Sequence, residues 1–261
     1  MTDRPAEPRP VVLVTGASRR IGREIALDLA AHGWDVAVHC RRSLAEAEAT
    51  AQRARDLGAD AEVFAADLAD NASCEALVPA VLLRCGRLDA VVNNASLFEY
   101  DDVDGFTVAT MERHWRANTA PAIVLARALH EHLAGRGARG CVVNLLDQKL
   151  VNPNPDYLSY TLSKAALQAA GTMLAQALAP VVRVCGVAPG VTLLSGPMTA
   201  DEFVAAHRLT PLQHSSTPAD VAHAVRFLLE SPAITGTTLL VDGGQHLQSQ
   251  PRDVLFLARK D

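Results

Sequence analysis

The sequence of 261 residues lacks any concentration of positive charge. Lysine and arginine number 24 against 29 aspartate and glutamate residues, which gives a formal net charge of −5. No basic stretch stands out that would attract phosphate groups, so composition gives no reason to expect binding to nucleic acid or to an anionic membrane. We therefore expect small molecules as the partners of this chain.

Paired cysteines are also missing. The five cysteines are Cys40, Cys74, Cys85, Cys141 and Cys185. Their odd number, their wide spacing and the absence of a Cys-x-x-Cys pair are typical of reduced thiols, not of disulfides or a zinc site. His130 and His132 are two positions apart on an expected helix and so face different ways, which does not make a metal site. We expect a cytoplasmic protein without a metal.

The beginning of the chain lacks an apolar run. Residues 1–10 contain three prolines and fit neither a signal peptide nor an anchor, so we expect a flexible leader there. No repeat, low-complexity tract or long linker follows. With 49% hydrophobic and 20% charged residues, the composition is that of a soluble globular protein with a sizeable core, and we expect one domain over residues 11–261.

Short apolar runs alternate with stretches of helical periodicity. After the first run, Ile21, Ile25 and Leu29 recur at four-residue steps up to Gly33, which predicts an amphipathic helix with a glycine at its end. Seven strands are expected near residues 11–15, 35–39, 62–65, 90–92, 141–144, 182–187 and 238–241. This alternation predicts an α/β fold, a single-domain Rossmann-type doubly wound parallel sheet with helices on both faces.

One long irregular stretch interrupts the alternation at about residues 191–218. It contains Gly196, Pro197, Pro211 and two candidate helix pieces. An insertion of this length in a compact domain is usually functional, and we expect it to form a lid over a substrate site.

A glycine-containing loop, Thr15-Gly-Ala-Ser-Arg-Arg-Ile-Gly22, lies between the first strand and the first helix. Backbone N–H groups and the helix dipole can hold a pyrophosphate at such a place. A glycine pair alone also suits a plain tight turn, so the prediction depends on the position of the loop. The expected cofactor contacts are Gly16, Ser18, Arg19, Arg20, Ile21 and Gly22.

The end of the second strand lacks the acidic residue that would bind the ribose 2′-hydroxyl of NAD. Two guanidinium groups and a hydroxyl there suit a 2′-phosphate, although two arginines opening a loop are often only solvated charge. We therefore predict NADPH as the cofactor. The expected contacts at this strand end are His39, Arg41, Arg42 and Ser43, and those after the next two strands are Asp67, Leu68, Asn94, Ala95 and Ser96.

Tyr160 and Lys164 are four residues apart, which places a phenol and an ammonium on one helical face. A tyrosine with its ordinary pKa of about 10 is a poor proton donor at neutral pH, and a neighbouring lysine charge lowers that pKa. Thirty residues downstream of the tyrosine, Pro189 and Gly190 end another expected strand. We predict that the pair is catalytic.

These motifs resemble the short-chain dehydrogenase/reductase family over residues 11–247. The family fingerprint Thr-Gly-x-x-x-Gly-x-Gly has Arg20 in place of its middle glycine here. The resemblance implies that Tyr160 donates a proton and that Lys164 activates it and holds the nicotinamide ribose. It also implies that Asn118 positions a water in the proton relay, and that Pro189 and Gly190 lie at the cofactor.

Within that family the chain resembles the pteridine reductases, which share the arginine at position 20, Ser96 in place of a glycine, Phe98 and Asp147. This resemblance implies that a pterin stacks between the nicotinamide and Phe98, as aromatic stacking suits a flat heterocycle. It implies that Ser96 contacts the cofactor phosphate or the pterin. Phe98 could also be an exposed or core phenylalanine that contacts no ligand.

Asp147 lies thirteen residues before Tyr160, where the family normally has a serine. An ionised carboxylate about 4 Å from the oxyanion of ketone reduction would cost about 4 kcal/mol at an effective dielectric of about 20, or nearly a thousandfold in rate. A pterin offers C=N bonds to reduce and N–H donors to the carboxylate. The leading hypothesis is an NADPH-dependent reductase of dihydropterin or dihydrofolate, with Ser96, Phe98, Asp147 and Tyr160 at the substrate.

Two other functions stay open. A carbonyl reductase of the 3-oxoacyl-thioester type would tolerate serine at position 147, and a non-catalytic dinucleotide sensor would have no use for Tyr160 and Lys164. A small-residue helix face suggests a homo-oligomer, and family members often form tetramers through such helices. That face comprises Ala165, Ala166, Ala169, Ala170 and Gly171. Residues 254–257 are a candidate for burial against a neighbouring subunit.

Overall fold

The computed structural model describes residues 8–194 and 198–258. Residues 1–7 of the expected leader and 195–197 of the expected lid lie outside the described residues. Seven strands form one sheet in the order β3-β2-β1-β4-β5-β6-β7, and every neighbouring pair is parallel. The strands are β1 (Val11–Val14), β2 (Asp35–Cys40), β3 (Ala61–Ala65), β4 (Ala90–Asn93), β5 (Gly140–Leu145), β6 (Val182–Pro189) and β7 (Thr238–Val241).

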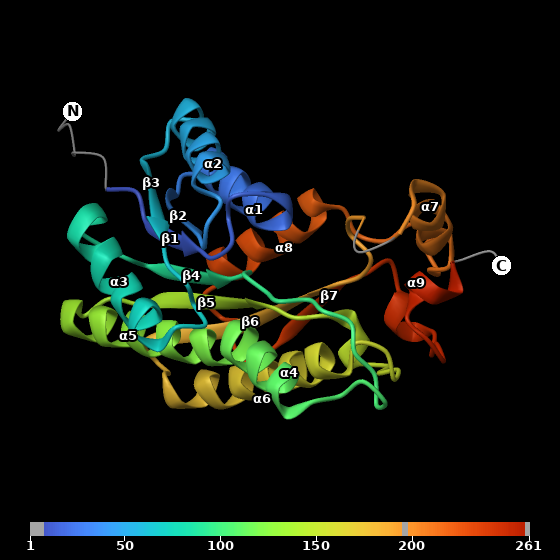
Figure 1. The fold of residues 1–261 in the computed structure, drawn as a ribbon. Helices are drawn as coiled ribbons and strands as arrows, with labels where there is room; N and C mark the ends of the chain where they lie inside the picture. The colour runs from blue at the N-terminus through green and yellow to red at the C-terminus, as the bar shows by residue number, and fades with distance from the viewer. Residues whose placement is uncertain (1–7, 195–197, 259–261) are drawn as a thin grey trace.

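Helices cover both faces of this sheet. Helices α1, α2 and α8 lie on one face, and α3, α5 and α6 lie on the other (Figure 1). The predicted Rossmann-type fold is thereby confirmed, and the expected strands coincide with the observed ones apart from their end residues. The helices are α1 (Arg20–Ala31), α2 (Leu44–Asp56), α3 (Asn71–Cys85), α4 (Val108–His114), α5 (Ala120–Arg136), α6 (Leu158–Ala177), α7 (Ala200–Arg208), α8 (Pro218–Glu230) and α9 (Val254–Leu257).

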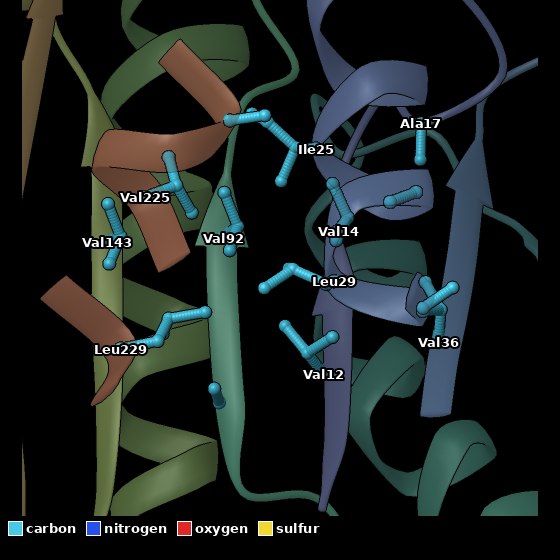
Figure 2. Packing of buried hydrophobic residues seen from close by; sticks show 14 of the residues in the cluster. Val12, Val14, Ala17, Ile25, Leu29, Val36, Val92, Val143, Val225 and Leu229 are labelled. Carbon is cyan, nitrogen blue, oxygen red and sulfur yellow. The ribbon is translucent and has the colours of Figure 1, made fainter. Parts of the chain in front are cut away.

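The core under α1 and α8 explains why the strand sequences are continuous apolar runs. Ile25 and Leu29 of α1 pack toward Val12 and Val14, while α8 packs over the neighbouring strands β4 and β5 (Figure 2). The alternate β1 residue Leu13 is fully buried in the core on the opposite face. A parallel sheet covered on both faces buries successive side chains, so its strands do not alternate with polar residues.

The position of β1 between β2 and β4 determines where the ligand-binding crevice of a Rossmann-type sheet lies. The chain leaves β1 toward β2 and later returns to the other side at β4, so the loops after these strands separate at the carboxyl edge of the sheet. Thr15 and Gly16 follow β1, and Asn94 follows β4. The glycine loop and the asparagine motif therefore face each other.

The expected lid region contains one helix in its described part. Helix α7 begins with a capping box in which Thr199 and Glu202 each accept a hydrogen bond from the other's backbone N–H. It packs against α9 at the end of the molecule beyond β7 (Figure 1). Val254 and Leu255 of α9 are buried within their own chain. These two residues are therefore covered without a neighbouring subunit.

Candidate active site

A first cavity of about 530 Å³ lies at the carboxyl edge of β1, β2 and β4. Its volume suits a small-molecule ligand. It brings together predicted cofactor residues from the loops after β1, β2, β3 and β4. Those lining it are Gly16, Ser18, Arg19, Arg20, Ile21, Gly22, His39, Arg41, Arg42, Ser43, Asp67, Leu68, Asn94, Ala95 and Ser96.

The glycine loop is held in shape by the loop after β4. Asn94 donates from Nδ2 to the carbonyl oxygen of Thr15 at 2.8 Å, and the N–H groups of Asn94 and Ala95 donate to the Thr15 hydroxyl. Gly16 has a φ of +66°, which favours glycine. Thr15 is buried and is a site-building residue that the sequence prediction did not single out.

Arg20 begins α1 in an unusual backbone conformation. Its φ of +56° lies in the left-handed region, where the family's usual glycine would be unstrained. Its guanidinium donates from Nη2 to the carbonyl oxygen of Leu194 at 2.9 Å. The side chain therefore bridges the glycine loop and the segment after β6.

His39 lines the first cavity and contacts the glycine loop. Gly16 N donates to its Nδ1 at 3.1 Å, and its Nε2 lies 3.0 Å from the carbonyl oxygen of Ala66. Burial lowers the pKa of His39, so the ring stays neutral. This geometry gives His39 a structural role in holding the glycine loop, and its ring also lines the first cavity, where it was predicted to contact the cofactor.

Arg41 and Arg42 are exposed at the end of β2. Neither guanidinium has an ion pair or hydrogen bond to another residue in the described part of the chain. Two uncommitted cations at the rim of the first cavity fit a phosphate at the cofactor's 2′ position. The donor set of the cavity thus fits the predicted cofactor.

A second cavity of about 300 Å³ continues from the first, since Arg20, Ile21, Asn94 and Ser96 line both. It contains the rest of the predicted site apart from Asn118, which lines neither cavity. Its predicted lining residues are Phe98, Asp147, Tyr160, Lys164, Pro189 and Gly190.

The catalytic candidates meet in this second cavity. The Tyr160 hydroxyl donates to Asp147 Oδ2 at 2.9 Å, and the other carboxylate oxygen accepts the Lys149 N–H at 2.9 Å. Lys164 donates from Nζ to the carbonyl oxygen of Leu145 at 2.7 Å and lies 5.8 Å from the centroid of the Tyr160 ring. Strand β5 thus places the acid, and helix α6 places the phenol and the ammonium.

The pKa shifts in this cluster follow from burial. Burial raises the pKa of Tyr160 well above its ordinary value, and the charge and hydrogen bond of Asp147 act in the same direction. The pKa of Tyr160 therefore shifts upward overall, opposite to the expected lowering. Burial also raises the pKa of Asp147 against the hydrogen bonds from Lys149 and Tyr160. It lowers the pKa of Lys164 to about 8.

Asn118 lies in a π-helical turn, Trp115–Thr119, that joins α4 to α5. Its Nδ2 donates to Ser163 Oγ and to the carbonyl oxygen of Leu97, and its Oδ1 accepts from Leu97 N and Ser96 Oγ. The amide is thus committed to protein groups. These bonds tie the loop after β4 to α6, and the part of Asn118 in a proton relay stays a prediction.

Phe98 stands at the mouth of the second cavity with 43% of its surface exposed. One face stacks on Tyr157, with ring centroids 4.3 Å apart, and the Tyr160 ring lies perpendicular to it with centroids 4.7 Å apart. Tyr157 therefore covers one face of the ring that was predicted to stack on a pterin. A flat ligand that stacks on Phe98 must therefore use the part of the ring that Tyr157 does not cover.

Comparison with known proteins places this site in a family. The family profile described as enoyl-(acyl carrier protein) reductase matches residues 16–246. The chain belongs to the short-chain dehydrogenase/reductase family. None of the helices in the described part of the chain has the length and apolar character needed to span a bilayer.

Three relatives in this family are informative. FolM alternative dihydrofolate reductase 1 from Brucella suis, solved in complex with NADP, has 42% sequence identity and a TM-score of 0.88 and covers 92% of this chain and 96% of its own. Pteridine reductase 1 from Leishmania tarentolae is 32% identical over 91% of this chain and 96% of its own length. A Streptomyces violaceoruber protein, named for ketoacyl reduction in the granaticin polyketide synthase, is 36% identical over 91% and 96% respectively.

Several residues complete this short-chain dehydrogenase/reductase site without a recognisable motif. Lys149, Tyr157, Asp253, Val254 and Leu255 line the second cavity. Tyr157 precedes α6 with a φ of +55°. Sequence reasoning missed these residues because their placement depends on contacts between the loop before α6 and the C-terminal segment, and no local pattern marks them.

Proposed function

We propose that this protein is an NADPH-dependent reductase of pteridines, which converts dihydropterin or dihydrofolate to the tetrahydro form. The observation that carries the proposal is the 2.9 Å hydrogen bond between Tyr160 and Asp147. A carboxylate in this place repels the oxyanion of a reduced ketone but accepts an N–H from a bicyclic nitrogen heterocycle. The Brucella suis and Leishmania tarentolae relatives support this substrate class.

The first cavity is proposed to hold the cofactor. The glycine loop and the start of α1 face the pyrophosphate, and Arg41 and Arg42 face the 2′-phosphate. Lys164 and Pro189 line the second cavity and are proposed to border the nicotinamide end of the cofactor. NADPH, when bound, supplies the hydride for a C=N bond of the pterin.

Tyr160 is the proposed proton donor to the nitrogen of that bond. Because burial and Asp147 raise the pKa of its hydroxyl, the group keeps its proton at neutral pH. Lys164, with a pKa of about 8, is mostly an ammonium at pH 7, and its positive charge offsets the phenolate that develops as the proton leaves. Asp147 holds the hydroxyl in place until the substrate arrives.

The test compares NADPH oxidation with dihydrobiopterin and with an acetoacetyl thioester. We expect turnover of the pterin, and a loss of about hundredfold or more in kcat/KM for Asp147→Ser, because the acid and its hydrogen bond to the donor are removed. Asp104→Ser changes an exposed aspartate and is the matched control. Its activity should equal that of the wild type.

The Streptomyces violaceoruber relative favours a second candidate, a 3-oxoacyl-thioester or other carbonyl reductase. This alternative predicts brisk thioester reduction that Asp147→Ser retains or increases. It also predicts no turnover of any pterin. Such a result would overturn the pteridine proposal.

We also propose that the chain forms a homotetramer in the cytoplasm. Leu162 and Met173 of α6 are exposed apolar side chains, and Ala165 and Ala169 lie exposed between them on the same helix. A second copy of α6 could cover this face closely because the alanines are small. The five unpaired thiols support a reducing compartment.

A further inference from the structure

The C-terminal segment, residues 252–258, forms one wall of the second cavity. Asp253, Val254 and Leu255 line it together with Tyr157 and Tyr160. Leu255 is buried in one apolar cluster with these two tyrosines. Helix α9 is only four residues long, and a helix this short has no stability of its own in water. Its position must come from contacts with the rest of the chain.

The strongest of these contacts is an ion pair between Arg252 and Asp156. Arg252 donates from Nε to Asp156 Oδ2 and from Nη2 to Asp156 Oδ1, each at 2.8 Å, which is the bidentate arrangement. Asp156 is 2% exposed and also accepts the Asp253 N–H at 2.7 Å. Although burial acts to raise the pKa of Asp156, the hydrogen bonds from Arg252 and Asp253 hold it below its ordinary value. The carboxylate therefore stays ionised.

A second pair lies nearer the reacting groups. Lys149 is 4% exposed, donates from Nζ to the carbonyl oxygen of Asp156 at 2.5 Å, and lies 3.3 Å from Asp253 Oδ2. Its own backbone N–H donates to Asp147. The contacts thus run without a break from the Tyr160 hydroxyl through Asp147 and Lys149 to the C-terminal segment.

We propose that Asp156 and Arg252 are positioning residues for substrate binding. Their ion pair joins the loop before α6 to the C-terminal segment, which holds Leu255 against the tyrosines and places Asp253 and Val254 beside it at the cavity. The cavity keeps its shape on the substrate side only while this wall is in place. The wall that the pair holds belongs to the second cavity and contributes no residue to the first, so we expect NADPH binding to be unaffected by its loss.

The test uses Arg252→Gln in the full chain. Losing a bidentate charge-assisted pair should raise KM for the pterin about tenfold or more, with kcat within about threefold of the wild type and KM for NADPH unchanged. Arg252→Lys keeps the positive charge but cannot make the two parallel hydrogen bonds of a guanidinium, so KM for the pterin should rise less than in Arg252→Gln. Arg127→Gln breaks an exposed ion pair with Glu75 far from the cavity and is the matched control, with no change expected.

Amide hydrogen exchange separates this proposal from the proposed function, on which it rests only for the choice of substrate. The peptide covering residues 253–258 should exchange faster in Arg252→Gln than in Arg127→Gln, whether or not substrate is present. If the wild type turns over no pterin, the proposed function fails and the exchange experiment alone decides the role of the pair. Equal exchange in the two variants, or an unchanged KM for the substrate that is reduced, would overturn the positioning role.

Discussion

Gly22, at the start of α1, leaves no room for a side chain. A Cβ there would lie 2.3 Å from the carbonyl oxygen of Gly16 and 2.4 Å from Asn94 Nδ2. We expect Gly22→Ala to lower the free energy of unfolding by about 1–3 kcal/mol through overpacking, or the Tm by about 2–4 °C per kcal/mol. NADPH binding should weaken as well, because both crowded atoms shape the glycine loop. Thermal unfolding and a fluorescence titration with NADPH measure the two effects.

Gly135, near the end of α5, is the matched control for this substitution. A Cβ at Gly135 would meet no atom within 4 Å, and alanine is the better helix former by about 0.5–1 kcal/mol. Gly135→Ala should therefore raise Tm slightly and leave NADPH binding unchanged. Equal Tm values for the two variants would show that the crowding at Gly22 is relieved by movement of the loop.

Lys164 gives the reaction an alkaline limit. Its pKa is lowered to about 8 by burial, so the ammonium is lost as pH rises through that value. We expect kcat/KM, which reports the free enzyme, to fall above a pH of about 8. Lys164→Met should be much less active and should lack this limb. A wild-type profile that is flat between pH 7 and about 9.5 would contradict the assignment.

The residues of the site were predictable from sequence where chemistry and spacing coincide. Tyr160, Lys164 and Asp147 follow from their separations along the chain, and the structure brings them together in the second cavity. The direction of the Tyr160 pKa shift was not predictable, because it depends on burial and on which neighbour the hydroxyl contacts. The same limit applies to Asn118 and His39, whose polar atoms turn out to be used by protein groups.

Among the elements, the start of helix α6 depends on a residue from the loop after β4. Asp101 is buried and accepts hydrogen bonds from the Ser159 N–H, at 2.9 Å, and from the Ser159 hydroxyl. Asp101→Ala should lower the free energy of unfolding by about 1–3 kcal/mol, since buried donors lose their acceptor. It should also reduce kcat, because Tyr160 is the next residue on this helical turn.

Asp70 provides the comparison for Asp101. It caps α3 by accepting the Ser73 N–H at 2.9 Å, and α3 contributes no residue to the second cavity. Asp70→Ala should cost about 1 kcal/mol of stability and leave kcat unchanged. Urea unfolding and steady-state kinetics distinguish the two variants. Equal kcat values would show that Asp101 serves stability alone.

The elements differed in how well the sequence predicted them. All seven strands were found because a strand buried on both faces is a continuous apolar run that stands out locally. The second cavity's C-terminal wall was not found, because Asp156 and Arg252 are 96 positions apart and neither belongs to a periodic pattern. Pairing between distant charged residues leaves no signal in a single sequence.

At the scale of the whole molecule, the exposed face of α6 predicts self-association. Met173 is 62% exposed although it is apolar. Met173→Glu places a charge on the proposed contact and should shift the assembly from tetramer toward smaller species. Light scattering after gel filtration measures this. Leu83→Glu changes an exposed leucine on α3, at 87% exposure, and should have no effect; a wild-type monomer would contradict the proposal.

The glycine loop that is proposed to bind the nucleotide takes its shape only when residues far apart in sequence are in contact. Asn94 and Thr15, whose hydrogen bonds shape that loop, are 79 positions apart and follow two paired strands. Cofactor binding to this loop is therefore linked to the folding equilibrium of the whole chain. A dinucleotide at a concentration of one hundred times its Kd adds about 2.7 kcal/mol to the free energy of unfolding. The lifetime of the protein against proteases should consequently follow the size of the cellular pool of reduced dinucleotide.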